Sequence, residues 1–138
     1  MEPLEGFEWV QEYLYLPWEK YATGPHSYDC FGVVYKGLGH LGCLPDRHLE
    51  VDGDDWALFH NTVLAEQESG NWRQLQGPVP GAVVLMSKAR MFHHVGLWVP
   101  HNGGCVLHSR RGAGVVLENI HRLQLQGMKK FEYWLPVR

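Results

Sequence analysis

One of the three cysteines in the chain, Cys30, lies where a thiol could become reactive. It follows the Gly24-Pro25 loop signal, and an apolar helical stripe begins directly after it, so we expect Cys30 in the first turn of a helix. Backbone N–H groups at a helix start lack helical partners and stabilise negative charge. A thiol in such a place has a pKa of roughly 3.5–7.5 instead of about 8.5, and the same amides can donate to an oxyanion. Cys30 is therefore a candidate nucleophile, although a lone cysteine is more often a small buried apolar residue.

Two histidines, His94 and His108, are candidates for the base that such a thiol needs. His94 opens an apolar run, His108 closes another, and Pro100-His101-Asn102-Gly103 between them indicates a hairpin turn. Residues directly opposite each other in an antiparallel pair project to the same face. If His108 pairs with His94 or with Gly96, the two imidazoles share a face. A register shifted by one residue sends them to opposite faces, and the sequence leaves the register open.

In a register that brings the imidazoles together, one of them can accept the thiol proton while the other orients it. We assign His94 as the base and His108 as the orienting group. The reverse assignment remains open, as does a His108 that simply ends its strand in contact with solvent. His93 is next to His94 and should point to the other face of a regular strand.

The histidines and cysteines of the chain form no metal-binding pattern. The closest local pair, Cys105 and His108, is spaced i, i+3 on a strand, which places the two side chains on opposite faces. No C-x-x-C or H-E-x-x-H spacing is present. We expect no metal site and no cofactor. The histidines that we expect to be solvated are His26, His40, His48, His60, His101 and His121.

The bulk composition is that of one globular domain spanning residues 1–138. Hydrophobic residues make up 45% of the chain and charged residues 20%, and the formal net charge is −3. There is no basic patch to bind nucleic acid and no apolar run long enough to span a membrane. The first eight residues are acidic rather than signal-like, so we expect the chain to fold in the cytoplasm that makes it. An odd number of cysteines argues against a disulfide framework.

Hydrophobic periodicity predicts helices first and short strands afterwards. The expected helices are Glu5–Leu16, one that starts at about Asp29 and carries the stripe Phe31, Val34, Tyr35 and Leu38, and one from about Asp54 to Glu68. The expected strands are Ala82–Met86, His94–Val99, Gly104–Ser109, Gly114–Leu117 and Phe131–Leu135. This order indicates an α+β domain with N-terminal helices packed on a C-terminal antiparallel sheet. Such a fold would set Cys30 at a helix start beside the sheet that carries both histidines.

Three segments together resemble the NlpC/P60 family of cysteine peptidases. Tyr28-Asp29-Cys30-Phe31-Gly32-Val33-Val34 is similar to the family's Asp-Cys-x-Gly-hydrophobic signature, and the resemblance covers residues 16–138. His94-Val95-Gly96-Leu97-Trp98 is similar to the His-Val-Gly motif, and Val106-Leu107-His108 to the third motif. The resemblance implies a papain-like fold, with Cys30 as nucleophile, His94 as base and His108 as the orienting member. It also implies hydrolysis of cell-wall peptides, often between D-glutamate and a diamino acid.

The resemblance further implies an oxyanion or substrate site close to the nucleophile. Its candidate residues are Asp29, Tyr28, Tyr21 and Trp18. Many members of the family place a tyrosine upstream of the nucleophile, and Tyr15, Trp18 and Tyr21 are the candidates for that place. Two residues depart from the family pattern: Phe31 replaces the commoner serine or tryptophan, and Ala82 stands where Pro-Gly-Asp is usual.

A narrower similarity is to NlpC/P60 proteins encoded with phage tail genes. It rests on Leu16-Pro17-Trp18, on Gly24-Pro25, and on residues 80–86 and 107–116. It implies a peptidoglycan hydrolase of the phage tail tip, carried in the virion and acting on stem peptides in the periplasm or cell wall, with other tail-tip or baseplate proteins as partners. The alternative is a structural tail-tip or assembly subunit that keeps the fold with little or no catalysis. Another papain-like activity, such as an amidase or acyltransferase, also remains open.

Overall fold

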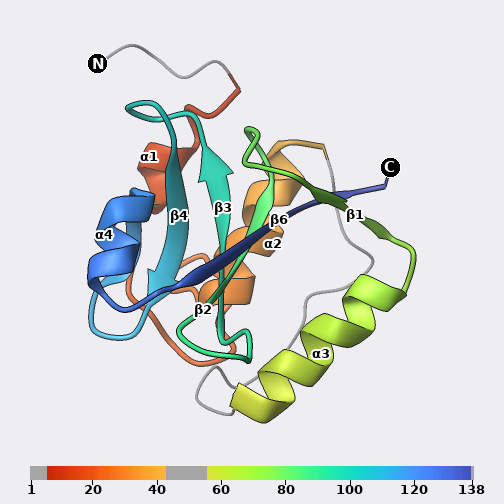
Figure 1. Ribbon diagram of the computed structural model, residues 1–138. Coiled ribbons are helices and arrows are strands. Elements are labelled where there is room, and N and C mark those ends of the chain that lie inside the picture. The colour runs from red at the N-terminus through yellow and green to blue at the C-terminus, as the bar shows by residue number, and fades with distance from the viewer. Residues whose placement is uncertain (1–5, 43–55, 138) are drawn as a thin grey trace.

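A six-stranded antiparallel sheet is the centre of the structure, with the strand order β1-β6-β2-β3-β4-β5 (Figure 1). The computed structural model describes residues 6–42 and 56–137. The strands are β1 (Trp72–Leu75), β2 (Val83–Ser87), β3 (His94–Val99), β4 (Cys105–Arg110), β5 (Gly114–Glu118) and β6 (Lys130–Pro136). The strand that comes last in the chain, β6, lies between β1 and β2. Helices combined with this sheet confirm the predicted α+β class.

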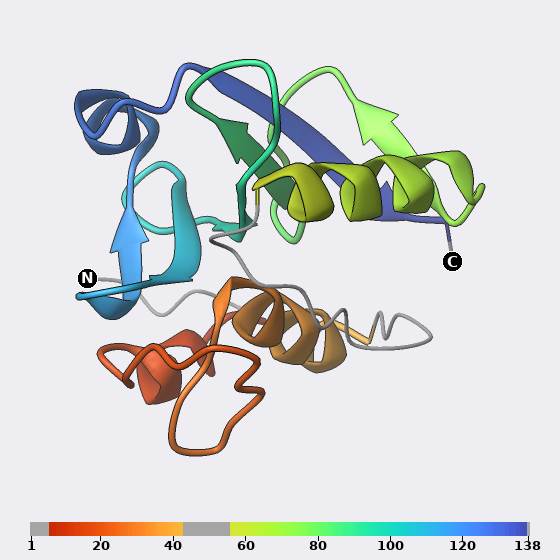
Figure 2. The same ribbon diagram turned by 90° about the horizontal axis from the view of Figure 1, so that it is seen from below.

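Helices lie on both sides of the sheet (Figure 2). Their bounds are α1 (Val10–Tyr13), α2 (Cys30–His40), α3 (Trp56–Glu68) and α4 (Ile120–Leu125). Phe31, Val34 and Leu38 of α2 belong to the larger core cluster. The same cluster contains Val95, Leu97 and Val99 of β3. Side chains of opposite parity, such as Val84 and Val106, form a second cluster with Leu123 of α4. Alternation along the strands therefore gives the sheet two buried faces, with α2 on one and α4 on the other.

The hairpin between β3 and β4 has the register that brings the two histidines to one face. Leu97 pairs with Leu107 and Val99 with Cys105, and continuing this pairing sets His108 across from Gly96. A Cβ atom built on Gly96 would lie 3.1 Å from Cβ of His108 and 2.3 Å from Cγ1 of Val106. Glycine at this position therefore lets β4 approach β3 closely where His108 projects.

The predicted elements agree best with the structure where the prediction rested on a strong apolar pattern. The β3 bounds agree with the prediction, and α2 begins within one residue of it. The predicted helix over Glu5–Leu16 was wrong in length, because Leu14 is extended and Tyr15 has a φ of 70°. Its first residue lies outside the described residues, as does the predicted Asp54 start of α3. Strand β1 and helix α4 were not predicted.

Candidate active site

The start of α2 is built by its own capping residues. Asp29 is the N-cap, and its Oδ1 accepts a hydrogen bond of 2.6 Å from the backbone N–H of Gly32. A Cβ atom on Gly32 would lie only 2.2 Å from the carbonyl oxygen of Ala22, so the helix start packs tightly against the preceding loop. These contacts explain why aspartate precedes Cys30 and glycine follows two residues later.

The Cys30 sulfur is more protected than its place at a helix start suggested. Its residue is 6% exposed, and burial raises the pKa of the thiol to about 12, with the nearby charge of Asp29 acting in the same direction. The backbone amides of Val95, Phe31 and Cys30 itself favour the thiolate, but they do not outweigh burial. The expectation of a depressed pKa was therefore wrong, because it considered the helix terminus without desolvation. The resting site holds a neutral thiol.

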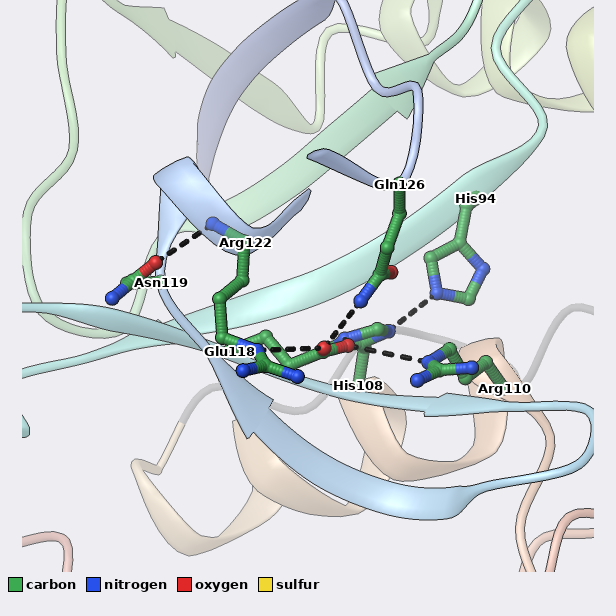
Figure 3. A network of polar contacts seen from close by, with 7 residues as sticks. All are labelled: His94, His108, Arg110, Glu118, Asn119, Arg122 and Gln126. Carbon is green, nitrogen blue, oxygen red and sulfur yellow. Dashed lines mark hydrogen bonds and ion pairs between the residues drawn. The ribbon is translucent and has the colours of Figure 1, made fainter. Parts of the chain in front are cut away.

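The two histidines are joined directly (Figure 3). Nε2 of His94 and Nδ1 of His108 are 2.7 Å apart, and the ring planes are nearly perpendicular at 80°. Burial holds the pKa of His94 well below the ordinary histidine value, and the neighbouring His108 acts in the same direction. His94 is therefore neutral at pH 7 and able to accept a proton.

A carboxylate that the sequence analysis did not identify completes this chain of contacts. Oε1 of Glu118, at the end of β5, lies 2.8 Å from Nε2 of His108. Glu118 is 5% exposed, and its hydrogen bond with His108 is the main reason that its pKa falls to about 2. The available signal was weak: with β5 antiparallel to β4, Glu118 pairs with Val106, on the face that His108 shares.

One cavity of about 390 Å³ is lined by all three predicted catalytic residues. Its lining residues are Trp18, Cys30, Lys88, His93, His94, His108, Arg110, Arg111, Gln126 and Met128. The Arg111 guanidinium lies 4.4 Å from the ring centre of Trp18, so these two side chains form one wall. In the described part of the chain, no direct hydrogen bond joins the Cys30 sulfur to either imidazole. The sulfur and the imidazoles thus meet at a shared cavity rather than in a closed dyad.

The other predicted substrate-site residues do not line this cavity. Tyr28 is 4% exposed, its carbonyl oxygen accepts a bond from the Ser109 hydroxyl, and its ring meets Tyr13 edge-on. Asp29 is directed into the helix cap. Tyr21 and Tyr15 are 48% and 78% exposed. Of the three upstream aromatic candidates, Trp18 is the one that lines the cavity.

Several other histidines are placed differently from what the sequence suggested. His93 precedes the regular strand, lines the same cavity as His94, and accepts a hydrogen bond at Nε2 from the backbone of Lys88. His60 is partly buried and accepts a bond from the backbone of Phe92, so it is not simply solvated. Among the residues that the structure describes, no cluster of histidine, cysteine and acidic side chains is arranged to hold a metal ion.

Comparisons with known proteins agree with this architecture at the level of fold. No protein-family model matches the sequence, and no curated protein matches it significantly. The NlpC/p60 domain of the peptidoglycan hydrolase SagA superposes with a TM-score of 0.60 at 12% identity, over 96% of this chain and 98% of that one. The fold is that of an NlpC/P60 domain. A lipoprotein-like NLP/P60-family protein of Staphylococcus aureus gives a TM-score of 0.57 at 13% identity, over 92% of this chain but only 39% of that protein.

In the described ranges, no helix has the length and apolar character needed to cross a membrane.

Proposed function

We propose that this chain is a cysteine peptidase that hydrolyses peptide bonds of bacterial peptidoglycan, with Cys30 as nucleophile and His94 as base. One observation carries the proposal: the sulfur at the start of α2 and the hydrogen-bonded pair of His94 and His108 line the same cavity. The NlpC/P60 fold supports it, since a domain with this fold belongs to a peptidoglycan hydrolase. His108 has the role of the orienting group.

In the proposed reaction, substrate binding in the cavity is accompanied by transfer of the Cys30 proton to His94. The thiolate attacks the peptide carbonyl carbon, and the C–N bond then breaks as His94 gives the proton to the departing amine. Water hydrolyses the resulting thioester, with His94 accepting one of its protons, and the thiol is restored. A neutral imidazole at rest is the form that this sequence of steps requires.

We further propose that the hydrolase acts at the tip of a phage tail, with peptidoglycan stem peptides as substrate and tail proteins as partners. The support is the similarity of residues 16–18, 24–25, 80–86 and 107–116 to tail-encoded NlpC/P60 proteins. Mass spectrometry of purified particles tests this location. Recovery of the chain from infected cells but not from particles would contradict it.

The hydrolase proposal is tested with purified peptidoglycan and the variant Cys30→Ala. Wild-type protein should release peptide fragments with new amino termini, and Cys30→Ala should release none. Cys105→Ala is the matched control, because Cys105 is also a buried free cysteine but lies at the far end of the β3–β4 hairpin. Equal release by wild type and Cys30→Ala would remove Cys30 from the reaction.

A second candidate function is favoured by the burial of the same thiol. A Cys30 that is 6% exposed with a raised pKa also suits a structural subunit that keeps the fold without catalysis. Such a subunit would assemble into tails normally when it carries Cys30→Ala, and its wild-type form would release no wall peptides.

A further inference from the structure

The buried Glu118 lies at the centre of a polar network that joins β4, β5 and the end of α4 (Figure 3). Besides His108, its carboxylate contacts Nε of Arg110 at 3.2 Å and Nε2 of Gln126 at 2.5 Å. Nε of Arg122 lies 3.6 Å away on the solvent side. The two arginines are 40% and 67% exposed, whereas Glu118 is 5% exposed. The carboxylate is thus fixed from several directions, with one oxygen committed to an imidazole that lines the catalytic cavity.

The protonation of this network fixes the direction of its hydrogen bonds. An ionised carboxylate can only accept, so Nε2 of His108 must donate to Glu118. In a neutral His108, Nδ1 is then an acceptor, and Nε2 of His94 must be the donor across the 2.7 Å contact. The remaining nitrogen of a neutral His94, Nδ1, is left as the acceptor. Two hydrogen bonds therefore determine which nitrogen of the base is free to take a proton.

We propose that Glu118 is a positioning residue of the active site, which sets the tautomers of His108 and His94 and stabilises the imidazolium that forms when His94 takes the Cys30 proton. The inference rests on the proposed function, because it assigns a fourth member to the same reaction. The S–H bond of Cys30 breaks and an N–H bond forms at Nδ1 of His94. No proton passes to Glu118, whose negative charge offsets the new positive charge through His108.

The physical need for such a group follows from the surroundings of His94. Burial opposes its protonation most, and the neighbouring His108, His93 and Arg110 add to that opposition, while the charge of Glu118 favours the protonated form. Without the Glu118 carboxylate, this network would contain no negative charge to stabilise the imidazolium of His94. Removing the carboxylate partner of a catalytic histidine in serine proteases lowers kcat by about 10⁴. Because Glu118 acts through a second imidazole, we expect a loss of about 10- to 100-fold, the range found for second-sphere partners of metal-bound histidines.

The inference is tested with Glu118→Gln, which keeps the shape and an acceptor but removes the charge, and with Glu118→Ala. Glu132→Gln is the matched control, because Glu132 is a partly buried strand carboxylate that binds Gln67 and Trp134 instead of a histidine. Three measurements apply: ring-nitrogen NMR for the tautomers, the alkylation rate of Cys30 by iodoacetamide between pH 5 and about 8.5, and kcat and KM on peptidoglycan.

The wild type should show both His94 and His108 protonated at Nε2. Glu118→Gln should slow neutral-pH alkylation and lower kcat by about 10- to 100-fold, with KM changed less than about 2-fold. Glu132→Gln should match the wild type in all three. A wild-type His108 protonated at Nδ1, or a folded Glu118→Gln with wild-type alkylation, would overturn the inference. If Glu118→Ala fails to fold, the NMR spectra of the wild type and of Glu118→Gln still test the inference.

The outcome also separates this inference from the hydrolase proposal. Suppose that the wild type releases no wall peptides but shows the expected tautomers, and that Glu118→Gln slows alkylation as expected. This result would support the positioning role of Glu118 and contradict the hydrolase proposal. Equal hydrolysis by wild type, Glu118→Gln and Glu118→Ala would support the hydrolase proposal and contradict the positioning role of Glu118.

Discussion

The reactivity of Cys30 depends on where its proton goes. A thiol with a pKa of about 12 is almost entirely protonated at pH 7, and a buried His94 with a lowered pKa is neutral. The thiolate–imidazolium pair contains the same number of protons as the neutral pair. Its population therefore does not change with pH between the two pKa values. The proposed pair of Cys30 and His94 would therefore have a pH signature that an isolated buried thiol lacks.

We predict that His94→Gln changes the shape of the Cys30 alkylation profile. In the wild type, the rate should level off across neutral pH, because the minor thiolate–imidazolium form reacts there. In His94→Gln, the rate should fall by about tenfold for each unit of pH below the thiol pKa, because only free thiolate remains. Iodoacetamide labelling followed by peptide mass spectrometry measures both profiles.

The exposed His121 of α4 provides the control for this variant. His121→Gln should keep the level region. A wild type whose rate falls continuously, as in His94→Gln, would show that His94 does not receive the proton and would favour the non-catalytic subunit.

At the scale of elements, the hairpin of β3 and β4 determines whether the histidines meet. A two-residue turn at Asn102-Gly103 would give the register shifted by one residue, which sends the two histidines to opposite faces. The observed register instead places them on one face. The observed turn continues through Gly104, whose φ is 122° and whose Cβ would meet the Trp98 ring at 2.2 Å. The connection is therefore longer than a two-residue turn, and its length gives the pairing in which His108 lies across from Gly96.

We predict that Gly96→Ala weakens this pairing. The added methyl group would overlap Val106 at 2.3 Å and crowd the carbonyl oxygen of Leu107 at 2.9 Å. Overpacking of this kind lowers the free energy of unfolding by about 1–3 kcal/mol. It should also displace His108 and slow hydrolysis.

Urea denaturation of Gly96→Ala beside Gly77→Ala measures the effect. No heavy atom lies within 4 Å of a Cβ built on Gly77, so that variant should stay within about 0.5 kcal/mol of wild type. Identical midpoints for all three proteins would show that β4 can move away from β3 without loss.

The parts of the structure that the sequence predicted are those in which one local pattern determines the result. The stripe of α2 and the apolar run of β3 are local, so periodicity found both. Helix α4 was missed because it is six residues long and half of its residues are polar, with Leu123 as its buried residue. Glu118 was missed because its importance comes from contacts with His108 and Arg110 of β4 and with Gln126 at the C-cap of α4, and none of them is visible in the neighbouring sequence.

At the scale of the whole molecule, two groups of the site make folding sensitive to acid. The pKa of His94 is lowered in the folded state, so stability falls as pH drops below the ordinary value of about 6.5 and the unfolded chain takes up the proton first. The pKa of Glu118 is lowered to about 2, so its contribution is complete above pH 4.5 and is lost as pH falls toward 2. Both effects have the same sign.

We therefore predict a melting temperature that decreases in two stages on acidification. The first stage should be smaller in His94→Gln and the second smaller in Glu118→Gln, because each variant removes one of the shifted groups. Calorimetry from pH 8 to pH 2 tests this. A melting temperature that is constant from pH 7 to pH 3 would contradict both assignments.

The position of β6 has a consequence for biosynthesis. Strands β1 and β2 do not pair with each other; each pairs with β6, which the ribosome makes after all the others. Until Lys130–Pro136 has emerged, β1 has no partner and β2 has only β3. Pairings between distant parts of a chain form slowly. A nascent chain halted after α4 would therefore leave β1 unpaired on both sides and β2 unpaired on one side, and these strands are the places where premature self-association would begin.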